Sequence, residues 1–141
     1  MIGVDTSFLV AFETAGHELN DAAWDLARRY SAETFAIAPQ VLSEFIHVTT
    51  DPRRFENPLS MSAARERALR WWQATETQQV FPTAPAVELF AQWMEEFSLG
   101  RKRILDTMLA AVYKTCGVSL VLSSNARDFA LFPGMHPVLL G

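Results

Sequence analysis

Short runs of apolar residues alternate along the chain with longer stretches in which apolar residues recur at helical spacing. Five apolar runs are predicted to form strands: 1–4, 34–39, 78–83, 118–125 and 136–140. Six stretches with helical spacing are predicted to form helices: 7–13, 18–32, 39–50, 60–75, 85–98 and 103–116. Strands that alternate with helices in this way favour a parallel sheet with helices on both faces.

Proline and glycine mark several of the predicted boundaries. Pro39 and Pro85 each open a predicted helix, where the missing backbone N–H is tolerated. Gly117 directly follows the helix at 103–116, as a C-terminal cap commonly does. Residues 51–58 contain two prolines and are predicted to form a loop. The extra helices between the second and third strands are expected at one edge of the sheet or on top of it.

The composition is that of an ordinary globular domain. Half of the 141 residues are hydrophobic and 20% are charged, which indicates one domain over residues 1–141. No apolar stretch approaches the roughly 20 residues that span a bilayer, and the N-terminus has no basic segment typical of a signal peptide. We therefore expect a cytoplasmic protein with no membrane partner. The single cysteine, Cys116, excludes an intrachain disulfide.

The chain is mildly acidic overall but locally basic. Its formal net charge of −4 argues against non-specific binding of polyanions over the whole surface. Arg101, Lys102 and Arg103 nevertheless form a basic cluster that could contact phosphates, with Arg53 and Arg54 on another loop. A solvated charge run is the plainer alternative, so a nucleic-acid substrate stays open.

Acidic and amide side chains follow two of the predicted strands. Asp5 comes directly after the first strand, and Asn125 and Asp128 follow the fourth. In a parallel α/β sheet, ligands bind beyond the carboxyl ends of the strands, where the strand order reverses. We therefore expect these three side chains at one rim of the sheet. Taken alone, Asp5 could simply cap the next helix, and Asp128 could be a turn residue.

Two predicted helices supply further carboxylates. Glu44 shares a helix face with Val41 and Val48, and Asp106 lies near the start of its helix beside apolar neighbours. A carboxylate on an apolar face needs something that compensates its charge. Alternatively, Glu44 could point to solvent and Asp106 could serve the helix dipole.

Four carboxylates brought to one rim would repel one another unless a cation compensated them. An all-oxygen ligand set suits Mg²⁺ or Mn²⁺ rather than zinc. The histidines, His17, His47 and His136, lack the spacing of a metal-ligating set. The sequence therefore predicts a magnesium or manganese site built from these carboxylates.

Four segments stand in a characteristic order: VDTSFLV at 4–10, VLSEF at 41–45, ILDTMLAA at 104–111 and LSSNARDFALFPG at 122–134. Together they resemble the PIN-domain ribonucleases, and more closely the VapC toxins of bacterial toxin–antitoxin pairs. The segment TTDPRRFENPLS at 49–60 is similar to a loop in one branch of these toxins. The resemblance covers essentially the whole chain.

The resemblance assigns roles to the acidic residues. Asp5, Glu44 and Asp106 match the family's three principal acidic positions, which implies catalytic and metal-binding roles. Asp128 matches a fourth, more variable acidic position, and Asn125 stands just before it. Either Asp128 or Asn125 could therefore face the metal.

The resemblance also implies a fold and an activity. Thr6 and Ser123 match small hydroxyl positions beside the site, and Ser123 stands where threonine is usual. The implied fold is a three-layer α/β/α sandwich around a parallel sheet, and the implied activity is Mg²⁺-dependent endonucleolytic cleavage of RNA, with water as the attacking group. A homodimer is implied, as is an antitoxin protein whose C-terminal segment covers the site. A catalytically inactive scaffold that binds RNA or protein is the alternative.

Overall fold

The five predicted strands form one parallel sheet in the computed structural model, which describes residues 1–140. The strands are β1 Ile2–Val4, β2 Phe35–Ile37, β3 Thr77–Gln79, β4 Leu120–Ser123 and β5 His136–Leu139. They lie in the order β3-β2-β1-β4-β5, and each neighbouring pair is parallel. The prediction of a parallel sheet is confirmed. Gly141, the last residue of the predicted domain, lies outside the described residues.

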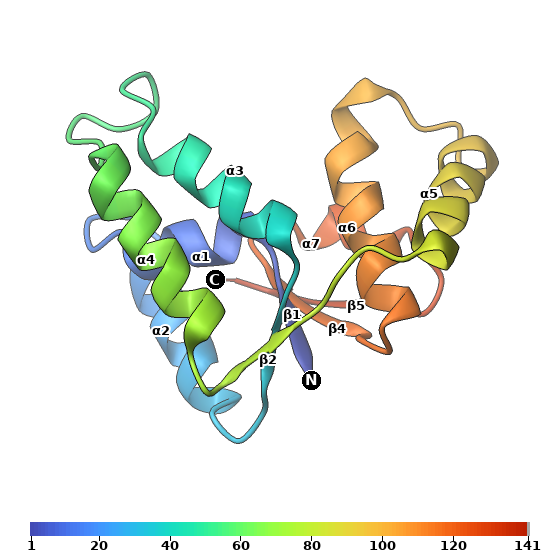
Figure 1. Ribbon diagram of the computed structural model, residues 1–141, viewed down its shortest axis with the longest axis horizontal. Helices are drawn as coiled ribbons and strands as arrows, with labels where there is room; N and C mark the ends of the chain where they lie inside the picture. The colour runs from blue at the N-terminus through green and yellow to red at the C-terminus, as the bar shows by residue number, and fades with distance from the viewer. Residues whose placement is uncertain (141) are drawn as a thin grey trace.

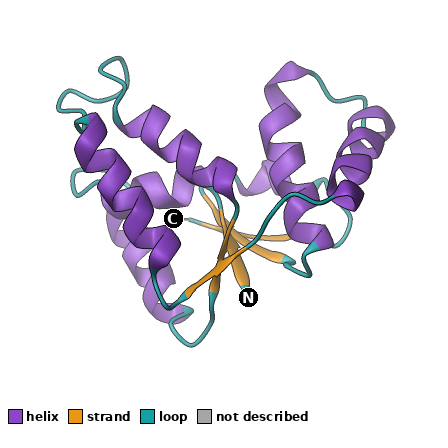
Figure 2. Cartoon of the chain, viewed as in Figure 1, coloured by secondary structure: helices purple, strands orange, loops and turns teal. Residues whose placement is uncertain are grey.

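Helices cover both faces of this sheet (Figure 1 and Figure 2). They are α1 Thr6–Glu13, α2 Asn20–Arg29, α3 Pro39–Thr49, α4 Met61–Gln73, α5 Ala84–Glu96, α6 Ile104–Thr115 and α7 Ala126–Ala130, with a 3₁₀ turn, η1, at Arg101–Arg103. The first four lie on one side and the last three on the other. Right-handed crossovers require this division, because the chain moves from β1 to β3 in one direction and then returns past β1 to β5. The predicted three-layer sandwich is confirmed. Among the helices described, none combines the length and apolar character needed to cross a membrane.

The register of the sheet puts the reversal of strand order between β1 and β4. Gly3 of β1 pairs with Ala36 of β2 on one side and with Val121 of β4 on the other. Asp5 and Ser124 each follow one of these neighbouring strands directly. Both residues therefore lie at the same edge of the sheet, the rim at which the sequence predicts Asp5 and Asn125.

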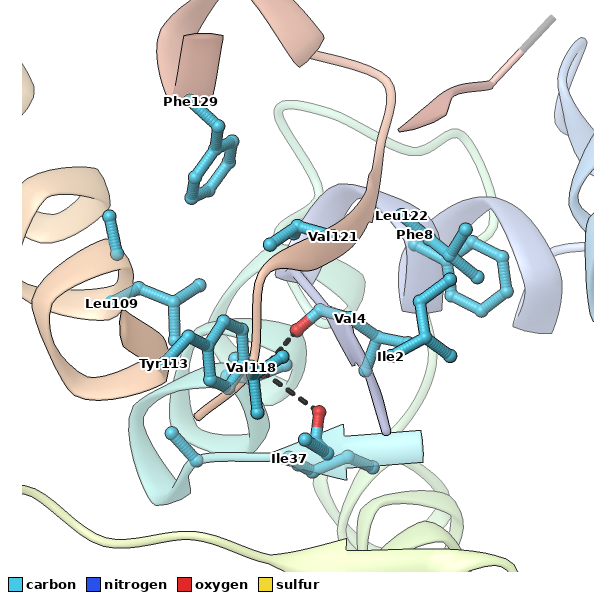
Figure 3. Close-up of a cluster of buried hydrophobic side chains, with 14 of the residues drawn as sticks. Ile2, Val4, Phe8, Ile37, Leu109, Tyr113, Val118, Val121, Leu122 and Phe129 are labelled. Carbon is cyan, nitrogen blue, oxygen red and sulfur yellow. Dashed lines mark hydrogen bonds between the residues drawn. The ribbon is translucent and has the colours of Figure 1, made fainter. Parts of the chain in front are cut away.

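Tyr113 of α6 ties its helix layer to strands β1 and β2 (Figure 3). Its ring is fully buried, and its hydroxyl donates to the carbonyl oxygens of Val4, at 2.5 Å, and Ala36, at 3.0 Å. The ring lies so close to Gly3 that a Cβ there would stand 2.8 Å from a ring carbon. Burial raises the pKa of Tyr113 well above its ordinary value, so the hydroxyl remains a donor. Glycine at position 3 permits this close approach.

The helix boundaries follow the local signals that the sequence provides. Pro39 opens α3, and Ser60 caps α4 by accepting the N–H of Ala63 at 3.1 Å. Gly117 follows α6 with φ of +80°, a left-handed conformation that glycine adopts without strain.

Four elements differ clearly from the prediction. The third strand is Thr77–Gln79 rather than 78–83, because its pairing with β2 ends at Gln79 and Pro82 has no N–H to continue it. The helix predicted at 18–32 is the shorter α2, which begins at Asn20, whose side chain donates to the last carbonyls of α1. The sequence predicted neither α7 nor η1, since both are too short to show helical spacing.

Candidate active site

A cavity of about 320 Å³ opens beyond the carboxyl ends of β1 and β4, where the strand order reverses. It is enclosed by the first turns of α1, by α3 and the loop after it, and by the start of α6. Three of the four predicted carboxylates line it: Asp5, Glu44 and Asp106. The structure therefore brings together acidic residues from three separate segments of the chain.

Asp5 is buried at the end of β1 and forms the N-cap of α1. Its Oδ1 accepts hydrogen bonds from the Phe8 backbone N–H at 2.9 Å and from the Ser7 hydroxyl at 2.6 Å. Its Oδ2 accepts from the Ser123 hydroxyl at 2.5 Å. Capping thus accounts for only one of three bonds to this carboxylate. A carboxylate offers about four acceptor positions, so one remains for a ligand.

Ser7, Asp5 and Ser123 form a hydrogen-bonded bracket between the ends of β1 and β4. The Ser7 oxygen accepts the Ser124 backbone N–H at 2.9 Å, and the Ser123 oxygen accepts the Asn125 backbone N–H at 2.8 Å. Each hydroxyl therefore both donates and accepts, which fixes its orientation. The sequence analysis did not identify Ser7. Its place two residues after a capping aspartate is the signal that could have found it.

The pKa of Asp5 lies above its ordinary value. Burial is the main cause, and the nearby charge of Glu44 adds to it. Hydrogen bonds from Ser123, Ser7 and Phe8 oppose the rise because they stabilise the ionised form. The site thus holds a carboxylate whose charge costs free energy until a cation or a proton arrives.

Asp106 is half-buried in the first turn of α6 and faces the same cavity. Burial raises its pKa to about 6. Repulsion by Asp128, Asp5 and Glu44 adds to this effect, and the guanidinium of Arg103 opposes it. The charges of the other three predicted carboxylates therefore all raise the pKa of Asp106.

Glu44 reaches the cavity from α3 and is half-buried. Gln40, one turn earlier, donates from Nε2 to the Glu44 Oε1 at 3.3 Å and to the Leu105 backbone oxygen at 3.0 Å. Because α3 and α6 cover opposite faces of the sheet, Gln40 links the two helix layers beside the carboxylates. The sequence analysis missed this residue, whose four-residue spacing from Glu44 was its one local signal.

The remaining predicted residues divide between the cavity and its surroundings. Thr6 and Asn125 line the cavity, and Ser123 is fully buried next to it. Asp128 lies on α7 outside the cavity wall and acts on Asp106 through its charge. Of the two candidates that the sequence left open at this position, Asn125 is the one at the cavity.

The predicted basic cluster also divides. Arg101 and Lys102 are exposed on η1. Arg103 is half-buried, and its Nη2 donates to the Asp128 backbone oxygen at 2.5 Å. Its guanidinium also lies over the Phe132 ring, 5.9 Å from the ring centre. Arg103 therefore holds α7 against α6, and the prediction of phosphate contacts rests on Arg101 and Lys102.

Three further residues complete the lining of the cavity on the side of the α1–α2 and α3–α4 loops: His17, Arg54 and Phe55. The sequence suggested a phosphate contact for Arg54 but no site role for His17 or Phe55. The likeness of the segment 49–60 to a toxin loop could have directed attention to Phe55. Arg53, the neighbour of Arg54, is exposed and lies outside the cavity wall.

The donor chemistry of the cavity fits a hard divalent ion. Within residues 1–140, no group of three or more His, Cys, Asp or Glu side chains stands close enough to hold a metal directly. Mg²⁺, however, retains several waters and needs only one or two protein carboxylates. A cation would also relieve the repulsion that raises the pKa of Asp106. The residues present therefore fit magnesium or manganese held partly through water.

The family of the chain is shown by its match to a family model. The PIN-domain model matches residues 2–134, a range that includes every acidic residue discussed above. The chain belongs to the PIN-domain family. Among curated proteins, none matches the chain significantly.

Solved structures with the same fold include bacterial toxins. VapC20 of Mycobacterium tuberculosis, described as a sarcin–ricin loop cleaving toxin, has a TM-score of 0.70 at 21% identity, over 92% of this chain and 94% of that one. VapBC2 of Rickettsia felis, bound to a promoter DNA fragment, has a TM-score of 0.68 at 14% identity, over 100% of both chains. DNA-bound VapBC of Salmonella typhimurium has a TM-score of 0.65 at 20% identity, also over 100% of both. At these identities the likeness establishes the fold.

Proposed function

We propose that this protein is a Mg²⁺- or Mn²⁺-dependent endoribonuclease that acts as the toxin of a toxin–antitoxin pair. The cavity carries the proposal, because Asp5, Glu44 and Asp106 converge there from three separate segments. Membership of the PIN-domain family and the fold shared with VapC toxins support it.

The residues around the cavity suit metal-assisted hydrolysis of a phosphodiester. A bound divalent ion supplies positive charge at the scissile phosphate and lowers the pKa of water. Asp5 and Asp106 would hold the ion directly, and Glu44 would act through water or hold a second ion. Asp128, outside the cavity wall, would contribute its charge or act through water. The hydrogen-bonded bracket fixes the orientation of Asp5. Attack by water leaves a 5′-phosphate and a 3′-hydroxyl on the cut RNA.

The proposal extends to partners. Several structures of the same fold are complexes of a toxin with its antitoxin, including one from Klebsiella pneumoniae. We therefore propose an antitoxin protein that binds over the cavity and blocks it, and a homodimeric toxin in the cytoplasm. Arg101 and Lys102, exposed on η1, would contact phosphates of the RNA outside the metal site.

A cleavage assay tests the proposal. Purified protein, freed of any partner, should cut RNA in Mg²⁺ or Mn²⁺ and stop on addition of EDTA. Asp5→Asn and Asp106→Asn should abolish cutting, whereas Asp21→Asn, at an exposed position on α2, should leave it intact. Cutting that survives both active-site substitutions refutes the assignment of the site. Binding of RNA without any cutting supports the inactive scaffold instead.

A further inference from the structure

The cavity has a second wall, which consists of His17, Arg54 and Phe55 and faces the same space as the carboxylates. We propose that this second wall binds one unpaired nucleotide next to the phosphodiester that is cut, with Phe55 stacking on its base and Arg54 contacting a phosphate. The inference rests on the proposed nuclease function and names the residues that would recognise the nucleotide beside the scissile bond.

The turn that carries Arg54 and Phe55 is held in place by Asp51. The Asp51 backbone oxygen accepts the N–H groups of Arg54, at 3.1 Å, and Phe55, at 3.2 Å, and its Oδ1 accepts the Arg53 N–H at 2.9 Å. A bond from the Leu59 N–H to the Thr49 oxygen, 2.9 Å, closes the loop. The second wall is therefore formed before any ligand arrives, which reduces the entropy lost on binding.

Phe55 has the character of a stacking platform. Its ring is half-buried and packs against the hydrophobic core on one side, while the residue also lines the cavity. An aromatic side chain anchored in this way offers a rigid face to a base. Bases of single-stranded RNA stack on such side chains in many RNA-binding domains.

Arg54 is the one cation among the described residues that line the cavity, and it stands opposite three carboxylates. Its Nε lies 3.7 Å from the Asp51 Oδ2, and 60% of its side chain is exposed. An ion pair so exposed is weak, so the guanidinium can turn to a phosphate at little cost. A phosphate entering this acidic cavity needs such a charge.

His17 offers a hydrogen-bond donor to the same nucleotide. Its Nδ1 accepts the Leu19 backbone N–H at 3.0 Å, so this nitrogen carries no proton. The ring nitrogen left to donate is therefore Nε2. That group is the donor the ring can present to a base edge or a phosphate.

The size of the cavity and the chemistry of stacking both favour an unpaired nucleotide. At about 320 Å³ the cavity is at the lower end of the range for small-molecule sites, which leaves room for one nucleotide unit. A base within a duplex has both faces covered by its neighbours and cannot stack on Phe55. Paired RNA should therefore be a poor substrate.

Two substrates separate this inference from the nuclease function itself. Bis(p-nitrophenyl) phosphate is a phosphodiester without a nucleobase, and a single-stranded oligoribonucleotide presents both base and phosphate. The same oligoribonucleotide annealed to its complement gives the paired form. In Mn²⁺, the wild-type protein should cut the single strand faster than the duplex.

Substitutions in the second wall should act mainly on the oligoribonucleotide. Phe55→Leu, which keeps the apolar contact with the core, should lower kcat/KM on the single strand by roughly 5- to 100-fold, more than on the small ester. Phe55→Tyr keeps the ring face and should stay close to wild type. Arg54→Ala should lower the salt dependence of binding, measured in the Asp106→Asn background, by about 0.7 in the log–log slope. Arg29→Ala, at an exposed position on α2, is the control and should leave that slope unchanged.

The outcomes are distinct. Equal cutting of single strand and duplex, or a Phe55→Leu variant whose losses are the same on both kinds of substrate, overturns the inference while leaving the nuclease function standing. A wild-type protein that cuts neither substrate ends the nuclease proposal. Binding of the unpaired strand, measured in the Asp106→Asn background, then still tests the second wall. If this wall binds a nucleotide, Phe55→Leu and Arg54→Ala should both weaken that binding.

Discussion

Asp5 receives hydrogen bonds from residues of α1 and of β4 at the point where the strand order reverses, and these bonds favour its ionised form. The Ser123 hydroxyl is the largest of the three influences that lower its pKa. Removing that hydroxyl should raise the pKa of Asp5 further, because the ionised form loses a donor. Protons should then compete more strongly with Mg²⁺ for this carboxylate.

We therefore expect Ser123→Ala to require more Mg²⁺ for half-maximal cleavage, with a difference from wild type that grows as the pH falls. The loss in kcat/KM should be about tenfold, the value of one charge-assisted hydrogen bond. Titrations of activity with Mg²⁺ at several pH values measure this. Ser123→Thr keeps the hydroxyl and should resemble wild type, and Ser119→Ala, at an exposed serine before β4, is the control. An unchanged Mg²⁺ requirement in Ser123→Ala contradicts the role given to the bracket.

Asp106 makes stability depend on pH in a direction opposite to that of a salt-bridged aspartate. Its pKa is raised from 3.8 to about 6, so the folded protein binds a proton that the unfolded chain has already released between these values. Stability should therefore fall as the pH rises from about 4 to about 6 and remain lower above that.

Asp106→Asn removes this loss of stability at higher pH, because the amide carries no charge. Without divalent ions at pH 7.5, the variant should be more stable than wild type by about 1 kcal/mol, or roughly 2–4 °C in Tm, after allowing for solvent screening. Thermal melts in EDTA at pH 4 and pH 7.5 test the prediction, and the difference should vanish at the lower pH. A variant less stable than wild type at both pH values would show that the carboxylate is not under repulsion.

At this scale the sequence picks out the three carboxylates that line the cavity but not the side chains that orient them. A carboxylate at a strand end or on an apolar helix face is conspicuous in one chain. The groups that orient it are ordinary residues whose partners are distant: Ser7 meets Ser124 across 117 positions, and Gln40 meets Leu105 across 65. No local sequence pattern predicts such a long-range hydrogen bond.

Among the elements, α6 is tied directly to the sheet, because the Tyr113 hydroxyl bonds to carbonyls of β1 and β2. Tyr113→Phe keeps the ring but leaves two buried carbonyl oxygens without this donor. We expect a loss of about 1–3 kcal/mol in the free energy of unfolding, measured by urea denaturation. Tyr30→Phe, at a half-buried tyrosine after α2, is the matched control and should cost less. Equal losses in the two variants would argue against the hydrogen bonds as the cause.

The elements themselves are predicted best where they are long or marked by caps. The helices around Pro39 and before Gly117 begin and end close to the predicted residues because proline and glycine restrict the backbone there. β3 is shifted because it is a short edge strand whose extent depends on its pairing with β2. α7 is missed because its five residues are stabilised from outside, by Arg103 and by the burial of Phe129.

The whole molecule should be stabilised by the ion that its active site is proposed to bind. A ligand that binds only the folded state adds about 2.7 kcal/mol at a hundredfold excess over its Kd. Saturating MgCl₂ at pH 7.5 should therefore raise the Tm of the wild-type protein by several degrees. The increase should be absent in Asp5→Asn and with NaCl at matched ionic strength. An equal rise in Tm with NaCl would show that the stabilisation comes from general charge screening and not from binding of Mg²⁺.

The bracket joins residues that lie 117 and 118 positions apart in the chain. Asp5 and Ser7 are made before α6 delivers Asp106, whereas Ser123 and Ser124 are made after it, at the end of β4. A nascent or prematurely terminated polypeptide that stops before β4 has its first carboxylate unoriented and one side of the cavity missing. The proposed activity thus requires that β4 has been made, so a polypeptide that stops before this strand should not cut RNA.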